Sequence, residues 1–174
     1  MENILEKEPI TITRASAGDF DEMNTVFPQS EQGLTEFQNA TQGDGHAEYL
    51  LARKGNSIVG KLYLNFSGVT YSAIKAKISD CPDLENIEVL PSLRGQGVGT
   101  KLIIQAEKIC KEKGFTKIGL GVAIDNPDTK NLYEKLGYRD SGFGEFEISF
   151  AWRSKTDAPE EVIHEKISYL IKAL

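Results

Sequence analysis

The stretch LPSLRGQGVGTKL, residues 90–102, constrains the fold of this chain more than any other part of the sequence. An apolar strand pattern ends at Pro91, which cannot donate a hydrogen bond to a sheet, and a helical pattern begins a few residues later. Glycine weakens both strands and helices, yet three glycines lie between the two elements: Gly95, Gly97 and Gly99. Such a sequence indicates that bare backbone is needed where this strand passes into a helix.

Periodicity and end signals predict the other elements. The expected strands are residues 10–16, a hairpin over residues 47–66 that turns at Gly55 and Asn56, and residues 84–90, 117–122 and 146–153. The expected helices are residues 18–27, 34–40, 98–113 and 126–137, the last with Asn126 as its N-cap. Residues 70–83 are expected to form a loop that carries a short strand. This order predicts an α/β or α+β domain with a mixed sheet.

The last segment, residues 157–174, is expected to be a C-terminal helix that packs on or extends a core formed by residues 10–154. Asp157, Pro159 and Glu160 resemble helix start signals. The large aliphatic residues fall on one helical stripe: Ile163, Ile167, Leu170 and Leu174. This stripe is expected to pack on the sheet; the alternative is a surface that pairs two chains in a homodimer.

Length and composition favour one domain over residues 1–174, with 40% hydrophobic and 26% charged residues. The net charge of −6 argues against nucleic acid as a partner, because phosphate contacts need clustered Lys and Arg. No apolar run of ~18 residues predicts a membrane helix, and the start MENILEKEPI lacks the pattern of an export signal. We therefore expect a cytoplasmic protein with reduced thiols at Cys81 and Cys110, no membrane partner and no metal, since these cysteines lack a metal-ligand spacing.

Free backbone N–H groups at a helix start form an anion site, and glycine lets a phosphate approach them closely. The dinucleotide pattern G-x-G-x-x-G fails because Thr100 stands in place of the third glycine. The nucleotide pattern G-x-x-x-x-G-K-[ST] fails because Lys101 comes one position late and Gly99 has no glycine five residues before it. Hydride transfer and nucleotide hydrolysis are therefore not supported.

Two ordered motifs resemble those of the GNAT superfamily of acyl-CoA-dependent N-acetyltransferases. The first is Arg94-x-x-Gly97-x-Gly99 after a strand that ends Val-x-Pro. The second is GLGVAIDNPDTKNLYEKLGY, which matches the family at these positions: Asn126, Leu132, Tyr133, Gly137 and Tyr138. Together they span roughly residues 84–138, and Thr129 departs from the family's usual alanine.

The resemblance implies a central mixed, mostly antiparallel twisted sheet, flanked by helices on both faces, in which two parallel strands splay apart. Acetyl-CoA would be the co-substrate: its pyrophosphate would lie on the loop 94–100 and its pantetheine arm between the splayed strands. The amide of Val89 or a neighbour would stabilise the oxyanion. The implied cofactor-binding residues are Val89, Leu90, Arg94, Gly95, Gln96, Gly97, Val98, Gly99, Thr100, Asn126 and Tyr133.

Tyr133 would protonate or hydrogen-bond the leaving thiolate, and Asn126 would contact the pantetheine; the alternatives are a core tyrosine and a simple N-cap. Glu85 is the expected base, with Asp83 in reserve, and surface carboxylates on a strand edge are the alternative. Strict period-two alternation assigns one face to Asp83, Glu85, Ile87 and Val89. It assigns the other face to Leu84, Asn86, Glu88 and Leu90.

The expected function is therefore transfer of acetyl to a primary amine by direct attack in a ternary complex. The alternatives are a catalytically silent CoA-binding sensor and an unrelated phosphate-binding protein. The acceptor would contact residues 28–45, 69–82 and 141–147, and acidic and amide groups there suit a cationic amine. His46 is expected in a polar loop, and His164 on the solvated side of the terminal helix.

Overall fold

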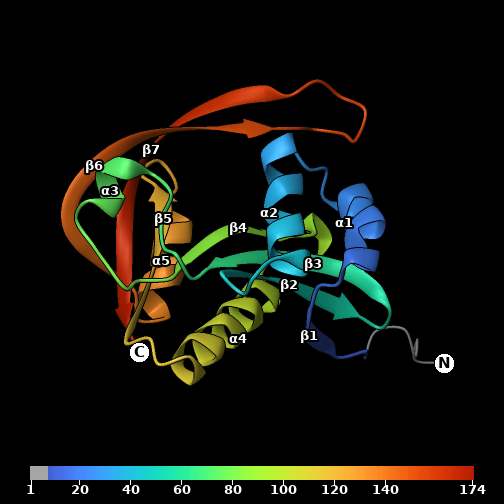
Figure 1. Ribbon diagram of the computed structural model, residues 1–174, viewed down its shortest axis with the longest axis horizontal. Helices are drawn as coiled ribbons and strands as arrows, with labels where there is room; N and C mark the ends of the chain where they lie inside the picture. The colour runs from blue at the N-terminus through green and yellow to red at the C-terminus, as the bar shows by residue number, and fades with distance from the viewer. Residues whose placement is uncertain (1–7) are drawn as a thin grey trace.

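Seven strands form a single sheet in the computed structural model, which describes residues 8–174 (Figure 1). Residues 1–7, which make up most of the start MENILEKEPI, lie outside the described residues, so the expectation about an export signal rests on the sequence alone. The spatial order is β1-β2-β3-β4-β5-β7-β6, and only β4 and β5 pair in parallel. The strands are β1 Ile10–Arg14, β2 Ala47–Lys54, β3 Ser57–Asn65, β4 Asp83–Val89, β5 Lys117–Ala123, β6 Arg139–Trp152 and β7 Glu161–Ala173.

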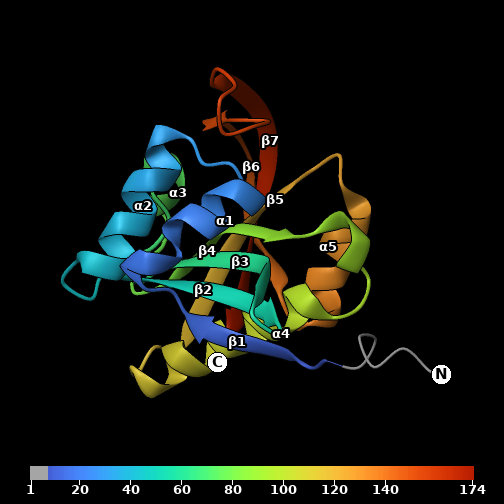
Figure 2. The same ribbon diagram turned by 90° about the vertical axis from the view of Figure 1, so that its right-hand side faces the viewer.

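Helices cover both faces of the sheet, as predicted (Figure 2). They are α1 Phe20–Val26, α2 Glu31–Gln42, α3 Ser72–Lys75, α4 Val98–Glu112 and α5 Pro127–Lys135, with 3-10 turns at Ala17–Asp19 and Pro91–Leu93. α1 and α2 lie on one face, while α4 and α5 lie on the other. The short strand expected within residues 70–83 is absent, and α3 occurs there instead. Within the described residues, no helix combines the length and apolar character needed to span a membrane.

Two separate cores follow from the alternation of side chains along β2 and β3. Leu50 and Leu62 belong to the core beneath α4, whereas Tyr49 and Leu51 belong to the core beneath α1 and α2. β2 and β3 therefore form a central layer that is buried on both faces.

The parallel strands β4 and β5 separate soon after they begin, as the resemblance implied. They pair only at Asp83↔Gly119 and Leu84↔Leu120. Beyond Leu84 the two strands share no further pairs, although β4 continues to Val89 and β5 to Ala123. The sheet therefore opens between the carboxyl-terminal halves of these strands.

The prediction of a C-terminal helix over residues 157–174 is wrong, because most of this segment forms strand β7, Glu161–Ala173. β7 pairs with β5 from Lys117↔Ala173 to Ala123↔Ile167 and so satisfies the second edge of β5. Residues 167–170 are consecutively buried because β7 is covered on both faces there. A buried apolar run fits a helix and a two-sided strand equally well, and only the distant partner β5 decides between them.

β6 and β7 form a long hairpin that leaves the edge of the sheet and lies over the N-terminal end of α2 (Figure 1). Along this hairpin, Ile148 of β6 lies opposite Glu165 of β7. The face of α2 and the inner face of the hairpin therefore enclose the space above β4.

Candidate active site

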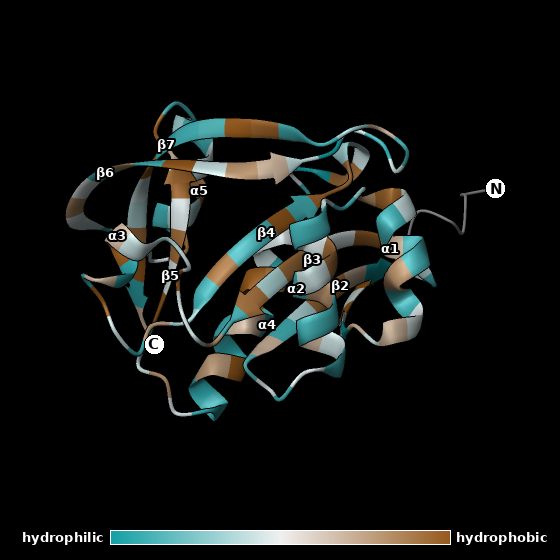
Figure 3. Cartoon of the chain, turned by 45° about the horizontal axis from the view of Figure 1, so that its top comes forward, coloured by the Kyte–Doolittle hydropathy of each residue, from teal (hydrophilic) through white to brown (hydrophobic). Residues whose placement is uncertain are grey.

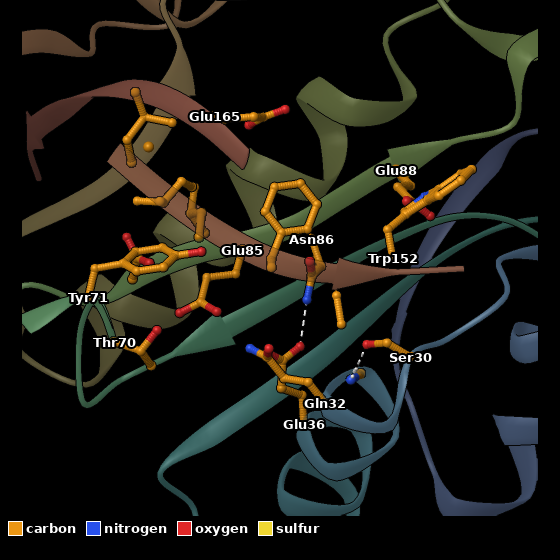
Figure 4. Close-up of a pocket in the computed structure, with 18 of the residues that line it drawn as sticks. Ser30, Gln32, Glu36, Thr70, Tyr71, Glu85, Asn86, Glu88, Trp152 and Glu165 are labelled. Carbon is orange, nitrogen blue, oxygen red and sulfur yellow. Dashed lines mark hydrogen bonds between the residues drawn. The ribbon is translucent and has the colours of Figure 1, made fainter. Parts of the chain in front are cut away.

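A cavity of about 270 Å³ lies between α2, β4 and the β6–β7 hairpin (Figure 4). Its carboxylates come from three elements: Glu36 of α2, Asp83, Glu85 and Glu88 of β4, and Glu165 of β7. Its aromatic side chains are Tyr71, Phe150, Trp152 and Tyr169. The expected acceptor segments 28–45 and 69–82 contribute Gln32 and Thr70, among others, whereas 141–147 contributes no lining residue.

The alternation expected along β4 breaks at a β-bulge. The β3–β4 register pairs Tyr63 with Glu85 but Lys61 with Glu88, so one residue of β3 lies opposite two of β4. Glu88 therefore joins Asp83 and Glu85 at the cavity, while Ile87 and Val89 pack in the core beneath α4. The expectation that Ile87 and Val89 share a face with Glu85 is wrong. Figure 3 shows both hydrophilic and hydrophobic residues along β4.

Asn86 holds this bulge in place. Its φ of 52° lies in the left-handed region, which asparagine tolerates better than most residues. Its side-chain amide donates to Glu36 Oε2, and its carbonyl accepts from Lys61 Nζ at 3.2 Å. The bulge is therefore tied to α2, by the hydrogen bond between Asn86 and Glu36 drawn in Figure 4, and also to β3.

Lys61 is a buried cation beside the cavity, with 2% of its surface exposed. Its Nζ lies 3.6 Å from Glu88 Oε2, although burial lowers the pKa of the ammonium group. Burial likewise raises the pKa of Glu36, which accepts hydrogen bonds from Gln32 and Asn86. Sequence reasoning did not identify Lys61 or Glu36, because a single charged residue in a strand or helix pattern is normally solvated.

Asp83 and Glu85 form an interacting pair at the floor of the cavity. Asp83 is 4% exposed and accepts a hydrogen bond from the Tyr169 hydroxyl at 2.8 Å. Glu85 is half-buried, and the Asn65 side-chain amide donates to it at 3.4 Å. Burial raises the pKa of both carboxyls, and the charge of Asp83 raises that of Glu85 further. Two close carboxylates that cannot easily both ionise retain a proton near neutral pH.

The glycine loop lies at the other face of the sheet, before α4. Gly95 and Gly97 have φ of 75° and 82°, and Gly97 is the N-cap of α4. A Cβ on either residue would meet no atom within 4 Å, so the loop surface is open. Among the described residues, the backbone N–H groups of residues 95–100 make no hydrogen bond. Free N–H groups at the start of a helix are the groups that an anion site requires, and the anion site itself stays a prediction.

The strand end before this loop differs in part from expectation. Leu90 donates its N–H to Val59 O at 2.9 Å, so this N–H is not free for a pantetheine arm, and its carbonyl already accepts one hydrogen bond, from Leu93 N–H at 2.9 Å. In an antiparallel pair successive residues point their N–H groups to opposite sides, so Val89 directs its N–H away from β3 and toward the opening beside β5. The side chain of Arg94 donates from Nε to Val89 O at 3.2 Å and so braces the turn.

Tyr133 and Asn126 lie on or before α5, away from the carboxylates. The Tyr133 ring packs edge-on against Tyr138 at 6.1 Å, and burial raises the pKa of its hydroxyl. Asn126 accepts a hydrogen bond from Thr129 N–H at 3.2 Å and is the predicted N-cap. Tyr133 does not line the cavity, because α5 and α2 lie on opposite faces of β4 and β5 (Figure 2).

The remaining candidates lie outside the cavity. Cys81 and Cys110 are buried free thiols, and His164 lies on the exposed side of β7 and not on a helix. His46 is exposed beside Asp44. In the described part of the chain, no group of three or more His, Cys, Asp or Glu side chains is placed to hold a metal ion.

Comparisons with known proteins agree with this architecture. The model of the acetyltransferase (GNAT) family matches residues 14–138. A putative ribosomal protein bS18-alanine N-acetyltransferase of Bacillus subtilis is 29% identical over 97 residues, which cover 56% of this chain and 57% of that protein. A thialysine N-epsilon-acetyltransferase of Mus musculus is 38% identical over 72 residues, which cover 41% of this chain and 42% of that protein. The chain thus matches only about half the length of these curated relatives.

A solved structure has the same fold. The crystal structure of a GNAT family acetyltransferase from Elizabethkingia anophelis with acetyl-CoA bound superposes with a TM-score of 0.64. The match covers 97% of this chain and 100% of the other, at 19% identity. The described sheet, including the β6–β7 hairpin, therefore belongs to a fold that solved acetyltransferases share.

Proposed function

The chain belongs to the GNAT family of acetyltransferases, and on that premise we propose that it transfers an acetyl group from acetyl-CoA to a cationic primary amine. Both substrates would bind together, and the amine would attack the thioester directly. The observation that carries this proposal is the opening between β4 and β5. The free amides before α4 lie on one face of the sheet and the acidic cavity lies on the other, and the acyl end of acetyl-CoA would reach from one to the other through this opening.

The residues of the chain suit the positions that this reaction needs. The open amides of residues 95–100 would hold the pyrophosphate of acetyl-CoA, and the Val89 N–H would face the thioester carbonyl in the opening. A hydrogen-bond donor at that point stabilises the oxyanion that forms when the amine attacks. Asn126 and Thr100 would contribute further polar contacts to the cofactor.

Glu85 would accept the proton that the amine must lose. An alkyl ammonium has a pKa of about 10 and no free electron pair, so a base must deprotonate it before or during attack. The amine nitrogen then bonds to the carbonyl carbon, the carbon–sulfur bond breaks, and the coenzyme A thiolate leaves. Tyr133, on the cofactor side of the sheet, would donate a hydrogen bond to that sulfur.

The charge of the cavity supports a cationic acceptor. Five carboxyl groups line it, whereas its cations are Lys61, which faces Glu88, and Arg153, which pairs with Glu160 at 3.3 Å. An acidic, partly apolar cavity raises the local concentration of a positively charged amine. Tyr71, Phe150 and Trp152 add aromatic faces that attract cations.

Calorimetric titration with acetyl-CoA tests the first half of this proposal. Gly97→Trp would place a large side chain over the open amides, and we expect it to abolish micromolar binding. Gly114→Trp is the matched control, because Gly114 also has a positive φ of 89° and open surroundings but ends α4 instead of starting it. Equal loss of binding in both variants would contradict the assignment of the loop.

An amine screen with acetyl-CoA tests the second half. Transfer to cationic amines that Glu85→Gln reduces by about 10²-fold or more would support the assigned base. Binding of acetyl-CoA without transfer to any amine would instead indicate a CoA-binding sensor. Failure of the folded protein to bind acetyl-CoA would leave the loop as a site for another anion.

A further inference from the structure

A buried hydrogen bond connects β7 to the carboxyl pair of β4. The Tyr169 hydroxyl donates to Asp83 Oδ1 at 2.8 Å, and the two residues are 86 positions apart in the sequence. Both are almost completely buried, with Tyr169 at 0% and Asp83 at 4% exposure. A hydrogen bond to a charged group in such surroundings is stronger than one at the surface.

β5 lies between these two strands, and its sequence leaves room for the contact. Gly119 of β5 pairs with Asp83 on one side, while β7 lies on its other side. A Cβ on Gly119 would overlap the ring and hydroxyl of Tyr169. The tyrosine therefore crosses β5 above a glycine to reach β4, and any other residue at position 119 would block it.

The hydrogen bond distinguishes two carboxyls that share one face of β4. Both carboxyls line the cavity, but Asp83 is 4% exposed and accepts the hydrogen bond from the Tyr169 hydroxyl. Glu85 is more exposed, has only the longer contact with Asn65, and lies beside Tyr71 (Figure 4). A donor favours the charged form of the carboxyl that accepts it. The charge then resides on Asp83, and the proton that the pair retains resides on Glu85. Glu85 must release this proton to solvent before it can accept one from the amine, so the acidic limb of the pH profile reports the ionisation of Glu85.

We propose that Tyr169 is a positioning residue for acetyl transfer: it fixes the negative charge on Asp83 and so makes Glu85 the carboxyl that exchanges a proton with the acceptor amine. This inference rests on the proposed function. A base with a nearby negative charge holds protons more tightly, and its proton affinity approaches that of an amine. The other titratable groups that face the pair are Cys81, Tyr63, Tyr71 and Glu36.

The pH profile of Tyr169→Phe tests this role. Without the hydroxyl, the proton that the pair retains stays on Asp83. Glu85 then ionises at a lower pH and is a weaker base. We expect the acidic limb of kcat/KM to move to lower pH by about one unit, and the plateau of kcat to fall. Asp83→Asn should move the limb in the same direction, and the double variant should move it no further than Asp83→Asn alone.

Tyr138→Phe is the matched control. Tyr138 is also fully buried and its hydroxyl also donates to a carboxylate, Glu107 Oε1 at 2.9 Å, but it packs in the core beneath α4. The Tyr138→Phe variant should be less stable than the unaltered protein, but the acidic limb of its kcat/KM profile should stay at the same pH. An unchanged or upward-moving limb in a folded Tyr169→Phe variant would overturn the inference.

Carboxyl titration by carbon-13 NMR gives a readout that needs no turnover. In the unaltered protein Asp83 should release its proton before Glu85, and Tyr169→Phe should reverse that order. If no amine is acetylated, the proposed function fails while this titration still decides the role of Tyr169. If the order stays the same, the inference fails whatever the enzyme acetylates.

Discussion

The carboxylate of Glu160 accepts a hydrogen bond from the backbone N–H of Glu31, although the two residues are 129 positions apart. Glu31 begins α2, and the first N–H groups of a helix lack partners within the helix. Glu160 lies in the loop between β6 and β7 and also pairs with Arg153. Because α2 and the hairpin form facing walls of the cavity, this contact fixes the distance between them.

Glu160→Ala should therefore loosen the acceptor side of the site. We expect the KM of the acceptor amine to rise several-fold while the Kd of acetyl-CoA is unchanged, because the glycine loop lies on the other face. The free energy of unfolding should fall by about 1 kcal/mol, as when a helix cap is removed. Steady-state kinetics and calorimetry measure these effects, with Glu161→Ala, at an exposed neighbour, as the control. A matching loss of acetyl-CoA affinity would contradict the assignment of the hairpin to the acceptor.

The bulge at Asn86 offers a second test. Asn86→Val places a β-branched residue at a φ of 52°, where such residues are strained, and removes the hydrogen bond to Glu36. We expect a loss of about 2–3 kcal/mol in unfolding free energy and a large fall in activity, because a straightened strand would turn Glu88 away from the cavity.

Asn86→Gly separates these two effects. Glycine adopts positive φ freely, so this variant should keep the bulge and lose only the side-chain contact with α2. Its stability should lie between those of the unaltered protein and Asn86→Val, with most activity retained. If the glycine variant is as inactive as the valine variant, the Asn86 side chain has a role beyond holding the bulge.

The sequence predicts what local chemistry determines. Gly95, Gly97 and Gly99 locate the turn from β4 into α4, and the first two have the positive φ that favours glycine. Asn126 followed by Pro127 locates the start of α5. The alternating and buried runs locate β1 to β5 within a few residues, whereas the strand expected at residues 146–153 covers only the second half of β6. Each of these signals lies within a few residues of the feature that it predicts.

Features that depend on distant partners were not predictable in this way. The segment 161–173 becomes a strand because β5 offers an unpaired edge, not because of its own periodicity. The extra residue of the bulge at Asn86 is invisible until β3 is aligned beside β4. Tyr169 gave no signal as a site residue, because its contact with Asp83 depends on Gly119 of a third strand that lies between them.

Glu165 should select acceptors that carry a second positive charge. It lies at the cavity opposite Ile148 on the hairpin, near Tyr71, and within the described residues it makes no ion pair. We expect 1,4-diaminobutane to be a better acceptor than butylamine, because its second ammonium group would reach this carboxylate. Glu165→Gln should raise the KM for the diamine about fivefold, equivalent to about 1 kcal/mol, and leave that for butylamine unchanged.

Glu147→Gln is the control for this prediction. Glu147 lies on β6 next to Ile148, but its side chain is largely exposed. Its Oε1 lies 3.9 Å from Lys166 Nζ, outside the cavity that Glu165 lines. It removes one negative charge from the same hairpin without altering the cavity. Equal effects of the two variants on the diamine would indicate a general attraction by charge and not a contact with Glu165.

Glu85→Gln should stabilise the fold at high pH while it reduces activity. Burial and the charge of Asp83 raise the pKa of Glu85 in the folded protein above its value in the unfolded chain. A raised pKa means that the stability contributed by the protonated carboxyl is fully present at low pH and is lost as pH rises through the folded value. Glutamine keeps the neutral shape at every pH, so the variant should avoid that loss. Urea unfolding at pH 9 should show a gain of about 1–2 kcal/mol over the unaltered protein, and unfolding at pH 4.5 should show almost none. A gain that is the same at both values would mean that Glu85 does not carry the retained proton.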